Sequence, residues 1–367
     1  MKIVYVSNSI VPSRTANSIH VMKMCQSLAM IGHEVNLIAY CRNNLIDDIY
    51  DYYGVSSSFI ITLIRAMNMR GATAFSLPRL YCELRKYKSS NTLVYARSIY
   101  GASIATSLGY RVVYETHWPP PNALIRCLEK SLFARKGFQK LVVISESLKR
   151  IYLSIFGKIR IVEVCHDAAS IPSVNTNVDY TWPCKRDRLQ IGYTGHLYRG
   201  RGIGLILQCA CRLPQYDFHI VGGMEKDIEY WRQNRGANVY FHGFVKPSLI
   251  PIVLNKCDVL LMPYQNGLSV AGKKIDTSKW MSPMKLFEYM ASRRVIVASN
   301  LSVLKEVLNK NNSILVDPES VNDWVSAIRT CENFGYRHRL AKSAYEELLS
   351  NYTWDKRAIK ALEDVKL

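Results

Sequence analysis

The sequence predicts an α/β protein built from two doubly wound, Rossmann-like domains. Its length of 367 residues suits two domains, each able to bury its own core. In both halves of the chain, short apolar runs typical of buried strands alternate with longer segments of helical periodicity. A polar segment at residues 171–188 contains two prolines and no clear periodicity, so it is predicted to be the linker.

The composition favours a cytoplasmic chain. Hydrophobic residues make up 49% of it, and no apolar run approaches the roughly 20 residues that span a bilayer. The first residues, Met1 to Val6, predict a strand rather than a signal peptide. The ten cysteines form no Cys-x-x-Cys pair and no Cys/His spacing of a zinc site, which indicates reduced thiols.

The net charge of +19 favours polyanionic partners, among them nucleic acid, anionic lipid and nucleotide sugars. The basic excess is divided almost evenly between the two halves of the chain, so the sequence contains no basic tail. This distribution argues against a disordered arm that binds nucleic acid.

The first domain is predicted to open with a strand at residues 2–7, a helix at 18–31 and a strand at 34–40. A dinucleotide fingerprint would place Gly-x-Gly-x-x-Gly in the loop after the first strand, but residues 7–17 contain no glycine. A dehydrogenase is therefore disfavoured.

Two later segments, residues 60–70 and 77–88, combine apolar and basic residues at helical spacing. Such helices can lie on a membrane surface, and they can equally be amphipathic helices that face a core. The spacing leaves both interpretations open.

A histidine follows one of the predicted strands of the first domain, the strand at residues 111–115. Neutral imidazole donates one hydrogen bond and accepts another, which suits His117 to a sugar hydroxyl; the alternative is a loop histidine with protein partners only. Another predicted strand, at 161–165, leads into His166 and Asp167, which we interpret as loop residues without an assigned role.

The second domain is predicted to begin with a strand at 189–193, followed by a loop rich in glycine and arginine at 194–203. Glycines allow the backbone to approach a ligand closely, and arginine pairs with phosphate oxygens. A predicted strand at 239–242 then leads through Gly243 to Phe244 and Val245.

A βαβ unit is predicted where buried strands at 257–263 and 295–299 flank a helix. Ser282 is expected to cap this helix, with Pro283 at its first position. The N-terminus of the helix would lie at the carboxyl end of a parallel sheet and favour an anion such as a diphosphate, and Lys285 would add a positive charge. Glu288 lies on nearly the same face and could accept two ribose hydroxyls; a solvated Lys–Glu pair is the alternative.

The run from Ser282 to Ser292 resembles the donor-binding segment of retaining GT-B glycosyltransferases of family 4, also called glycosyl transferases group 1, of the bacterial surface-polysaccharide type. Glu288 matches the second of two family glutamates, which holds the ribose, and Trp280 occupies the position of the first. Gly195 matches the glycine of the family's phosphate loop, with His196 in place of its arginine and Arg201 in place of its lysine. Glu115-x-His117 resembles the family's histidine at the inter-domain cleft.

The resemblance implies the GT-B fold, in which two Rossmann-like domains face each other across a cleft. The implied domains are residues 1–170 on the acceptor side, 189–350 for the nucleotide sugar, and a terminal helix at 351–367 that packs back on the first domain. The implied catalytic residues are His117, Arg201 and Lys285. The residues implied to bind the donor are Gly195, His196, Arg201, Phe244, Val245, Ser282, Met284, Lys285, Leu286 and Glu288.

The implied reaction moves a sugar from a UDP- or GDP-sugar to a saccharide or lipid-linked saccharide, with retention and without a metal or other cofactor. By the same resemblance, the acceptor brings the first domain to the anionic inner face of the plasma membrane, in surface-polysaccharide synthesis. Two other enzymes on this fold stay open, a nucleotide-sugar epimerase and a sugar phosphorylase. A basic nucleic-acid-binding protein is the alternative from a different class.

Overall fold

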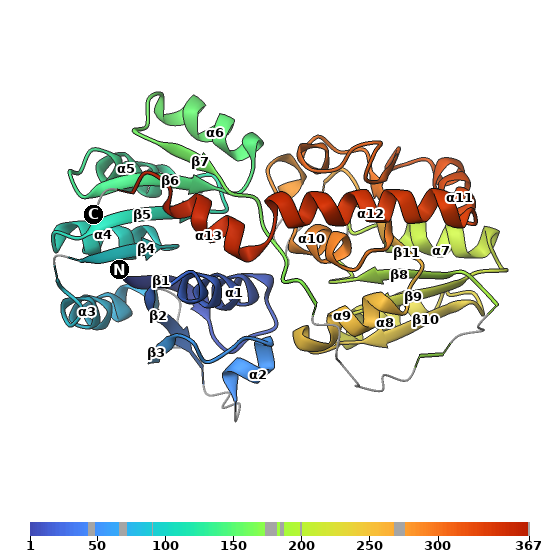
Figure 1. Cartoon of the computed structure of the whole chain (residues 1–367), viewed down its shortest axis with the longest axis horizontal. Coiled ribbons are helices and arrows are strands. Elements are labelled where there is room, and N and C mark those ends of the chain that lie inside the picture. The colour runs from blue at the N-terminus through green and yellow to red at the C-terminus, as the bar shows by residue number, and fades with distance from the viewer. Residues whose placement is uncertain are drawn as a thin grey trace. The chain divides into compact units, whose positions relative to one another are not determined.

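The computed structural model describes residues 1–42, 48–65, 72–89, 91–172, 182–183, 187–198, 200–267 and 276–365. It consists of two compact units, which are described separately (Figure 1). The first unit comprises Met1–Asp167 together with Trp354–Leu367, and the second comprises Ala168–Thr353.

The first unit is built on a seven-stranded sheet in which every pairing is parallel, with the strand order β3-β2-β1-β4-β5-β6-β7. The order reverses beside β1, as in a doubly wound sheet. The strands are β1 (Lys2–Ile10), β2 (Glu34–Cys41), β3 (Ile60–Arg65), β4 (Thr92–Ala96), β5 (Arg111–Thr116), β6 (Phe138–Val143) and β7 (Val162–Val164). The helices are α1 (Ala16–Met30), α2 (Ile49–Tyr53), α3 (Ala72–Arg85), α4 (Ile99–Ser107), α5 (Ala123–Phe133), α6 (Glu146–Phe156) and α13 (Trp354–Leu362).

The second unit repeats this topology with six parallel strands in the order β10-β9-β8-β11-β12-β13. Its strands are β8 (Gln190–Thr194), β9 (Asp217–Val221), β10 (Val239–Gly243), β11 (Val259–Met262), β12 (Val295–Ser299) and β13 (Ile314–Val316). Its α-helices are α7 (Ile203–Arg212), α8 (Glu225–Arg232), α9 (Ile250–Asn255), α10 (Met284–Ala291), α11 (Val321–Thr330) and α12 (Phe334–Asn351). The predicted fold class is confirmed.

Both faces of the second sheet are covered, which explains why its strands are continuous apolar runs. In β11, Val259 and Leu261 face a core shared with α7 and α11, whereas Leu260 and Met262 face a core shared with α10 and α12. Because α10 lies between β11 and β12 in sequence and these strands pair in parallel, the predicted βαβ unit is confirmed.

The helix predicted over residues 60–70 is wrong. Ile60–Arg65 forms the edge strand β3, paired in parallel with β2, and residues 66–70 lie outside the described part of the chain. The run is rich in β-branched residues, and pairing with β2 outweighs its helical spacing. The second apolar-basic segment is helical as expected from residue 77 to Arg85, where α3 ends.

The predicted cap of the central helix is also wrong by one residue. Pro283, with an extended backbone at φ −82° and ψ 121°, occupies the N-cap position, and α10 begins at Met284. The carbonyl oxygen of Pro283 accepts a hydrogen bond from the N–H of Leu286 at 2.9 Å. Ser282 therefore precedes the cap instead of forming it. In the described part of the chain, no helix is both long and apolar enough to cross a membrane.

Candidate functional site

Glycines bring the carboxyl ends of β8, β9 and β10 together in the second unit. The N–H of Gly195 donates to Val221 O at 2.8 Å, and the N–H of Gly222 donates to Gly243 O at 2.6 Å. A Cβ at Gly222, whose φ is +108°, would overlap the carbonyl oxygen of Gly195. Only glycine permits this approach, which leads the chain from β8 into the loop that carries His196.

Helix α10 is fixed to this edge of the sheet by Tyr289. The Tyr289 hydroxyl accepts a hydrogen bond from the N–H of Thr194 at 2.9 Å, at the end of β8. Lys285 lies one turn earlier on the same face of α10. Its ammonium group consequently reaches the loop after β8, where a Cβ built on Gly195 would lie 2.9 Å from Lys285 Nζ.

Lys285 and Arg201 form a pair of enclosed cations beside two tyrosine rings. Lys285 Nζ lies 3.8 Å from the ring centre of Tyr193 and 5.0 Å from that of Tyr264, and the Arg201 guanidinium lies 4.9 Å from the Tyr264 ring centre. Lys285 Nζ and Arg201 Nε are enclosed and make no hydrogen bond to the described residues. The tyrosine faces stabilise the positive charges only in part.

Burial and the neighbouring Arg201 charge hold the pKa of Lys285 well below its ordinary value, and Glu288 opposes this in part. Two cations with unused donors indicate an anion site, because an anion would supply both the missing acceptors and the missing negative charge.

His196 joins this cluster as a neutral group. Its carbonyl oxygen accepts from the Tyr193 hydroxyl at 2.7 Å, and its ring stacks on Tyr198 with 4.7 Å between centres. Burial, followed by the charges of Arg201 and Lys285, lowers the pKa of the His196 ring. The second unit thus brings together the predicted residues Gly195, His196, Arg201 and Lys285.

Other predicted donor-binding residues have varied surroundings. Leu286 lies in the apolar core with its N–H bonded to Pro283, so it offers no free donor; Ser282 and Met284 are buried at the start of α10. After β10, Val245 packs against apolar side chains, whereas Phe244 is 38% exposed.

In the first unit, the carboxylate of Glu115 is the centre of a buried polar cluster. The Tyr95 hydroxyl donates to its Oε2, and Arg357 of α13 binds both oxygens, at 3.2 Å to Oε2 and 3.0 Å to Oε1. His117 Nε2 lies 2.6 Å from Oε1, and Arg97 Nε lies 3.5 Å from the same oxygen. The predicted site residue His117 is therefore held by a carboxylate two residues earlier in the chain.

His20, on α1, extends this cluster to Asp167. Its Nε2 lies 3.0 Å from Glu115 Oε1, and its Nδ1 lies 2.8 Å from Asp167 Oδ1. No role is predicted from the sequence for His20, Asp167 or Arg357. A usable signal was the placement of Arg357 on a face of α13 whose other buried residues are Trp354, Ala358 and Ala361.

His20, His117 and Asp167 are also the candidate metal ligands of the described residues, since their donor atoms lie within 4.8 Å of one another. Two histidines and a carboxylate are a ligand set used by transition metals. However, the guanidinium groups of Arg97 and Arg357 lie against the carboxylate of Glu115 in the same cluster, and they would repel a divalent cation.

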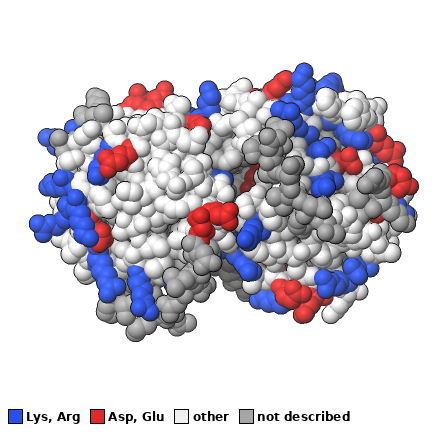
Figure 2. Space-filling model, turned by 60° about the horizontal axis from the view of Figure 1, so that its bottom comes forward, with Lys and Arg blue, Asp and Glu red and all other residues white. Residues whose placement is uncertain are grey.

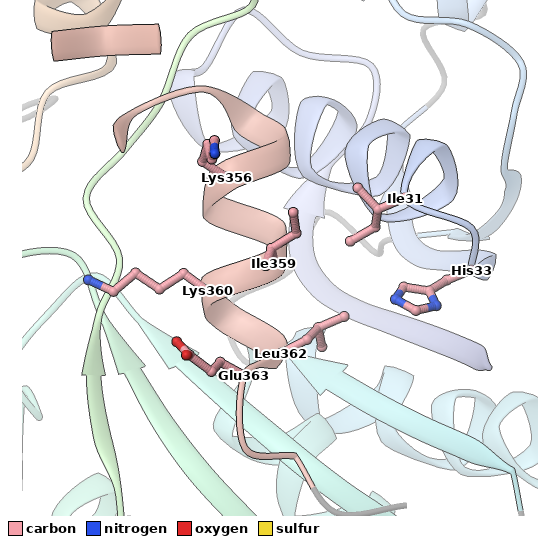
Figure 3. Close-up of a pocket in the computed structure, with 7 residues that line it drawn as sticks. All are labelled: Ile31, His33, Lys356, Ile359, Lys360, Leu362 and Glu363. Atoms are coloured by element: carbon pink, nitrogen blue, oxygen red, sulfur yellow. The ribbon is translucent and has the colours of Figure 1, made fainter. Parts of the chain in front are cut away.

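A shallow groove of about 480 Å³ lies elsewhere on the first unit, along α13 (Figure 3). Ile31 and His33 face Ile359 and Leu362 across it, while Lys360 points to the other side of the helix, where it pairs with Glu163 at 3.3 Å. None of its lining residues is a predicted site residue, so the two polar clusters remain the candidate sites.

Comparison with known proteins identifies the second unit. Residues 188–333 match the family model "Glycosyl transferases group 1". The second unit carries a glycosyl transferases group 1 domain. The match contains β8 to β13 and α10, and with them the cluster of His196, Arg201 and Lys285. The expected family is confirmed for this part of the chain, as glycosyl transferases group 1.

A curated relative of this chain is TuaH of Bacillus subtilis strain 168, named as a teichuronic acid biosynthesis glycosyltransferase. The two are 25% identical over 118 residues, which is 32% of this chain and only 28% of TuaH.

Solved structures resemble the whole chain. Alr3699/HepE of Anabaena, solved in complex with UDP-glucose, has a TM-score of 0.69 at 16% identity, covering 99% of this chain and 98% of that one. TarM of Staphylococcus aureus, solved as a point mutant with UDP, fondaparinux and alpha-GlcNAc-glycerol, has a TM-score of 0.70 at 10% identity and covers 99% of both chains. At these identities the likeness establishes the shared GT-B fold.

Proposed function

We propose that the protein transfers a sugar from a nucleotide diphosphate sugar to a saccharide or lipid-linked saccharide, with retention at the anomeric carbon. The observation that carries this proposal is the pair of enclosed cations, Lys285 and Arg201, with unused hydrogen-bond donors inside a glycosyl transferases group 1 domain. A diphosphate fits such a pair, because each phosphate oxygen accepts hydrogen bonds and carries negative charge.

The proposed role of the two cations is to stabilise the leaving diphosphate, whose charge grows as the bond to the sugar breaks. Groups that are already oriented toward a developing charge lower the barrier most, and loss of one such donor costs roughly 3 kcal/mol, about a hundredfold in rate. In this proposal no metal is required. Glu288 accepts the ribose hydroxyls, and His117 contacts the transferred sugar.

The donor is proposed to be a UDP- or GDP-sugar. Support for UDP comes from the structural neighbours, since HepE was solved in complex with UDP-glucose and TarM in complex with UDP. Gly195, Phe244 and Val245, together with Ser282, Met284 and Leu286 at the start of α10, are proposed to line the donor through backbone and apolar contacts.

The acceptor is proposed to be a surface polysaccharide or its lipid-linked precursor, met at the anionic inner face of the plasma membrane. Support comes from TuaH, named for teichuronic acid biosynthesis, and from the net charge of +19. Figure 2 shows basic side chains gathered at the left edge of the view, on the first unit. On α3, Arg79 and Arg85 are exposed whereas Leu80 and Leu84 are buried. One helix thus has a core face and a basic outer face.

Binding and product analysis test this function. We expect UDP or GDP to raise the melting temperature of the wild type and not of Lys285→Met, since a ligand at 100 times its Kd adds about 2.7 kcal/mol of stability. Lys279→Met, which removes an exposed lysine just before the helix, is the matched control and should respond like the wild type.

Retention is tested by the anomeric configuration of the product, read by NMR, and metal independence by activity in excess EDTA. An inverted product, or activity that is lost in EDTA and restored by magnesium or manganese, contradicts the corresponding part of the proposal. Conversion of the donor with no acceptor present would favour the epimerase instead.

A further inference from the structure

Five side chains converge on one buried carboxylate in the first unit. Glu115 is 1% exposed, and it is contacted by Tyr95, Arg97, Arg357, His20 and His117. A buried carboxylate needs hydrogen-bond donors for its remaining lone pairs as well as a positive charge, and these side chains supply both. The contacts determine which nitrogen of His117 carries its proton.

Glu115 is ionised in this cluster. Arg357 binds its carboxylate at 3.2 Å to Oε2 and 3.0 Å to Oε1, and Arg97 Nε lies 3.5 Å from Oε1, so the negative charge lies between two guanidinium groups. An ionised carboxylate only accepts hydrogen bonds. His117 Nε2, 2.6 Å from Oε1, must therefore be the donor.

The ring of His117 carries no second proton near neutral pH. Burial, and then the charge of Arg97, lowers the pKa of His117 to about 3, although Glu115 opposes the shift. With its single proton on Nε2, the ring has a lone pair on Nδ1. The hydrogen bond that the His117 ring makes to the described residues is through Nε2, and the side chain is 18% exposed, so Nδ1 is an acceptor available to a ligand hydroxyl.

Residues from three distant parts of the chain hold Glu115 and His117 in this state. His20 lies between Glu115 and Asp167, and its ring stands edge-on to that of His117, with 4.9 Å between centres and 81° between planes. Arg357 binds Glu115 through both oxygens and donates from Nε to His166 O at 2.9 Å, next to Asp167.

We propose that His20, Asp167 and Arg357 are positioning residues for His117: through Glu115 they keep its proton on Nε2 and present Nδ1 to a hydroxyl of the sugar substrate. The inference rests on the proposed function for the identity of that hydroxyl. It adds that the terminal helix α13 completes the first-unit site, because Arg357 lies on it.

The tautomer of His117 is measurable without any substrate. In the full-length protein labelled with ¹⁵N-histidine, long-range ¹H–¹⁵N correlation spectra distinguish protonated from unprotonated ring nitrogens, and His117→Gln identifies the signal. We expect the wild type to hold the proton on Nε2 from pH 8 down to about pH 5. Asp167→Asn and Arg357→Lys should give mixed tautomers or a ring that protonates at higher pH.

Lys360→Met is the matched control for Arg357→Lys. It lies on the same helix, pairs with Glu163 at 3.3 Å and makes no contact with Glu115, so the His117 signals should stay as in the wild type. Asp167→Asn replaces one carboxylate oxygen by an amide nitrogen, so the inference can still be tested with this variant if Arg357→Lys fails to fold.

Steady-state kinetics provide the second readout. Asp167→Asn and Arg357→Lys should lower kcat/KM about tenfold, the value of one hydrogen bond to substrate, while Lys360→Met leaves it unchanged. A wild-type proton on Nδ1, a tautomer unaffected by both variants, or a stoichiometric metal ion on His117 overturns the inference. If His117→Gln transfers sugar at the wild-type rate, the proposed role of His117 is wrong even where its tautomer is as expected.

Discussion

Lys285 Nζ lies 3.8 Å from the ring centre of Tyr193, with no hydrogen-bond partner among the described residues. An ammonium group over an aromatic face keeps part of its charge stabilisation, but it loses the hydration that three N–H donors require. The pKa of Lys285 is therefore held well below its ordinary value, by burial and by Arg201. A bound anion would reverse this shift, and that coupling can be measured.

The first prediction is that nucleotide binding takes up a proton. A diphosphate beside Lys285 raises its pKa, so the bound protein carries more protons than the free protein at any pH between the two pKa values. Titration calorimetry of UDP in buffers of different ionisation enthalpy should show this uptake rising as the pH passes the pKa of free Lys285, and falling again as the pH passes the pKa of the complex.

Lys285→Met should bind more weakly and with less proton uptake, and Lys279→Met should match the wild type. A binding enthalpy of the wild type that is the same in every buffer, at every pH at which the protein is folded, would contradict the prediction.

The second prediction concerns Glu129, a carboxyl group buried on α5. Its Oε1 accepts from the hydroxyls of Tyr114 at 2.9 Å and Tyr152 at 2.8 Å, while Oε2 has no partner in the described part of the chain. Burial raises the pKa of Glu129 to about 7, which the tyrosine hydrogen bonds oppose. Since the folded pKa exceeds the unfolded one, this group's stabilising contribution is complete at acid pH and is lost as pH rises through about 7.

The free energy of unfolding should therefore fall with pH, by on the order of 2 kcal/mol between pH 5 and pH 8 from this group. Glu129→Gln keeps an acceptor at Oε1 and removes the ionisation, so its unfolding free energy should exceed that of the wild type at pH 8. Urea unfolding at several pH values measures this. Glu34→Gln, which removes an exposed carboxylate, is the control, and parallel curves for Glu129→Gln and the wild type would rule the prediction out.

The third prediction separates steric overlap from backbone strain at Gly202. Gly202 has a φ of +78° and caps α7, and a Cβ there would overlap the carbonyl oxygen of Pro263. Gly267 has the same φ of +78° with nothing within 4 Å, so Gly267→Ala measures strain alone, about 1 kcal/mol.

Urea unfolding should show that Gly202→Ala lowers the free energy of unfolding by about 2 kcal/mol more than Gly267→Ala does, because the backbone of Pro263 must move. The same substitution should also weaken UDP binding, since Gly202 follows Arg201 directly. Equal losses of unfolding free energy in the two variants would mean that the backbone at Pro263 moves at no measurable cost, and would contradict the prediction.

The central strands could be predicted from the sequence because their signal is local. Residues 295–299 form a strand with the predicted bounds, and the strands predicted at 34–40 and 111–115 are each one residue longer, as buried parallel strands are uninterrupted apolar runs. Helix starts were less predictable. At Pro283, whether the proline caps the helix or begins it depends on one backbone rotation that the residue type does not determine.

The first-unit cluster could be predicted only at His117. His20 is 147 residues from Asp167, and Arg357 is 242 residues from Glu115, so no spacing in the sequence connects these pairs. Their proximity follows from the order of strands in the sheet and from the return of α13 to the first unit. The proximity of Arg201 and Lys285 was easier to predict from the sequence, because each residue follows a strand whose carboxyl end lies at the same edge of the second sheet.

The last prediction is that the exposed face of α3 contributes to attachment at an anionic membrane. Arg79 and Arg85 are exposed on it, and each basic residue near such a surface contributes about 1 kcal/mol. We expect the wild type to float with liposomes that contain anionic lipid at low salt, and to be released as salt is raised. Arg79→Glu/Arg85→Glu should lower the partition coefficient at least about thirtyfold, the effect of about 2 kcal/mol.

The charge-matched control is Lys226→Glu/Arg232→Glu, which reverses two exposed basic residues on α8 of the second unit. If both double variants lose attachment equally, net charge and not the α3 face governs it. If the wild type floats with neither anionic nor neutral liposomes at low salt, the acceptor is met in solution, and the basic face of α3 is simply hydrated.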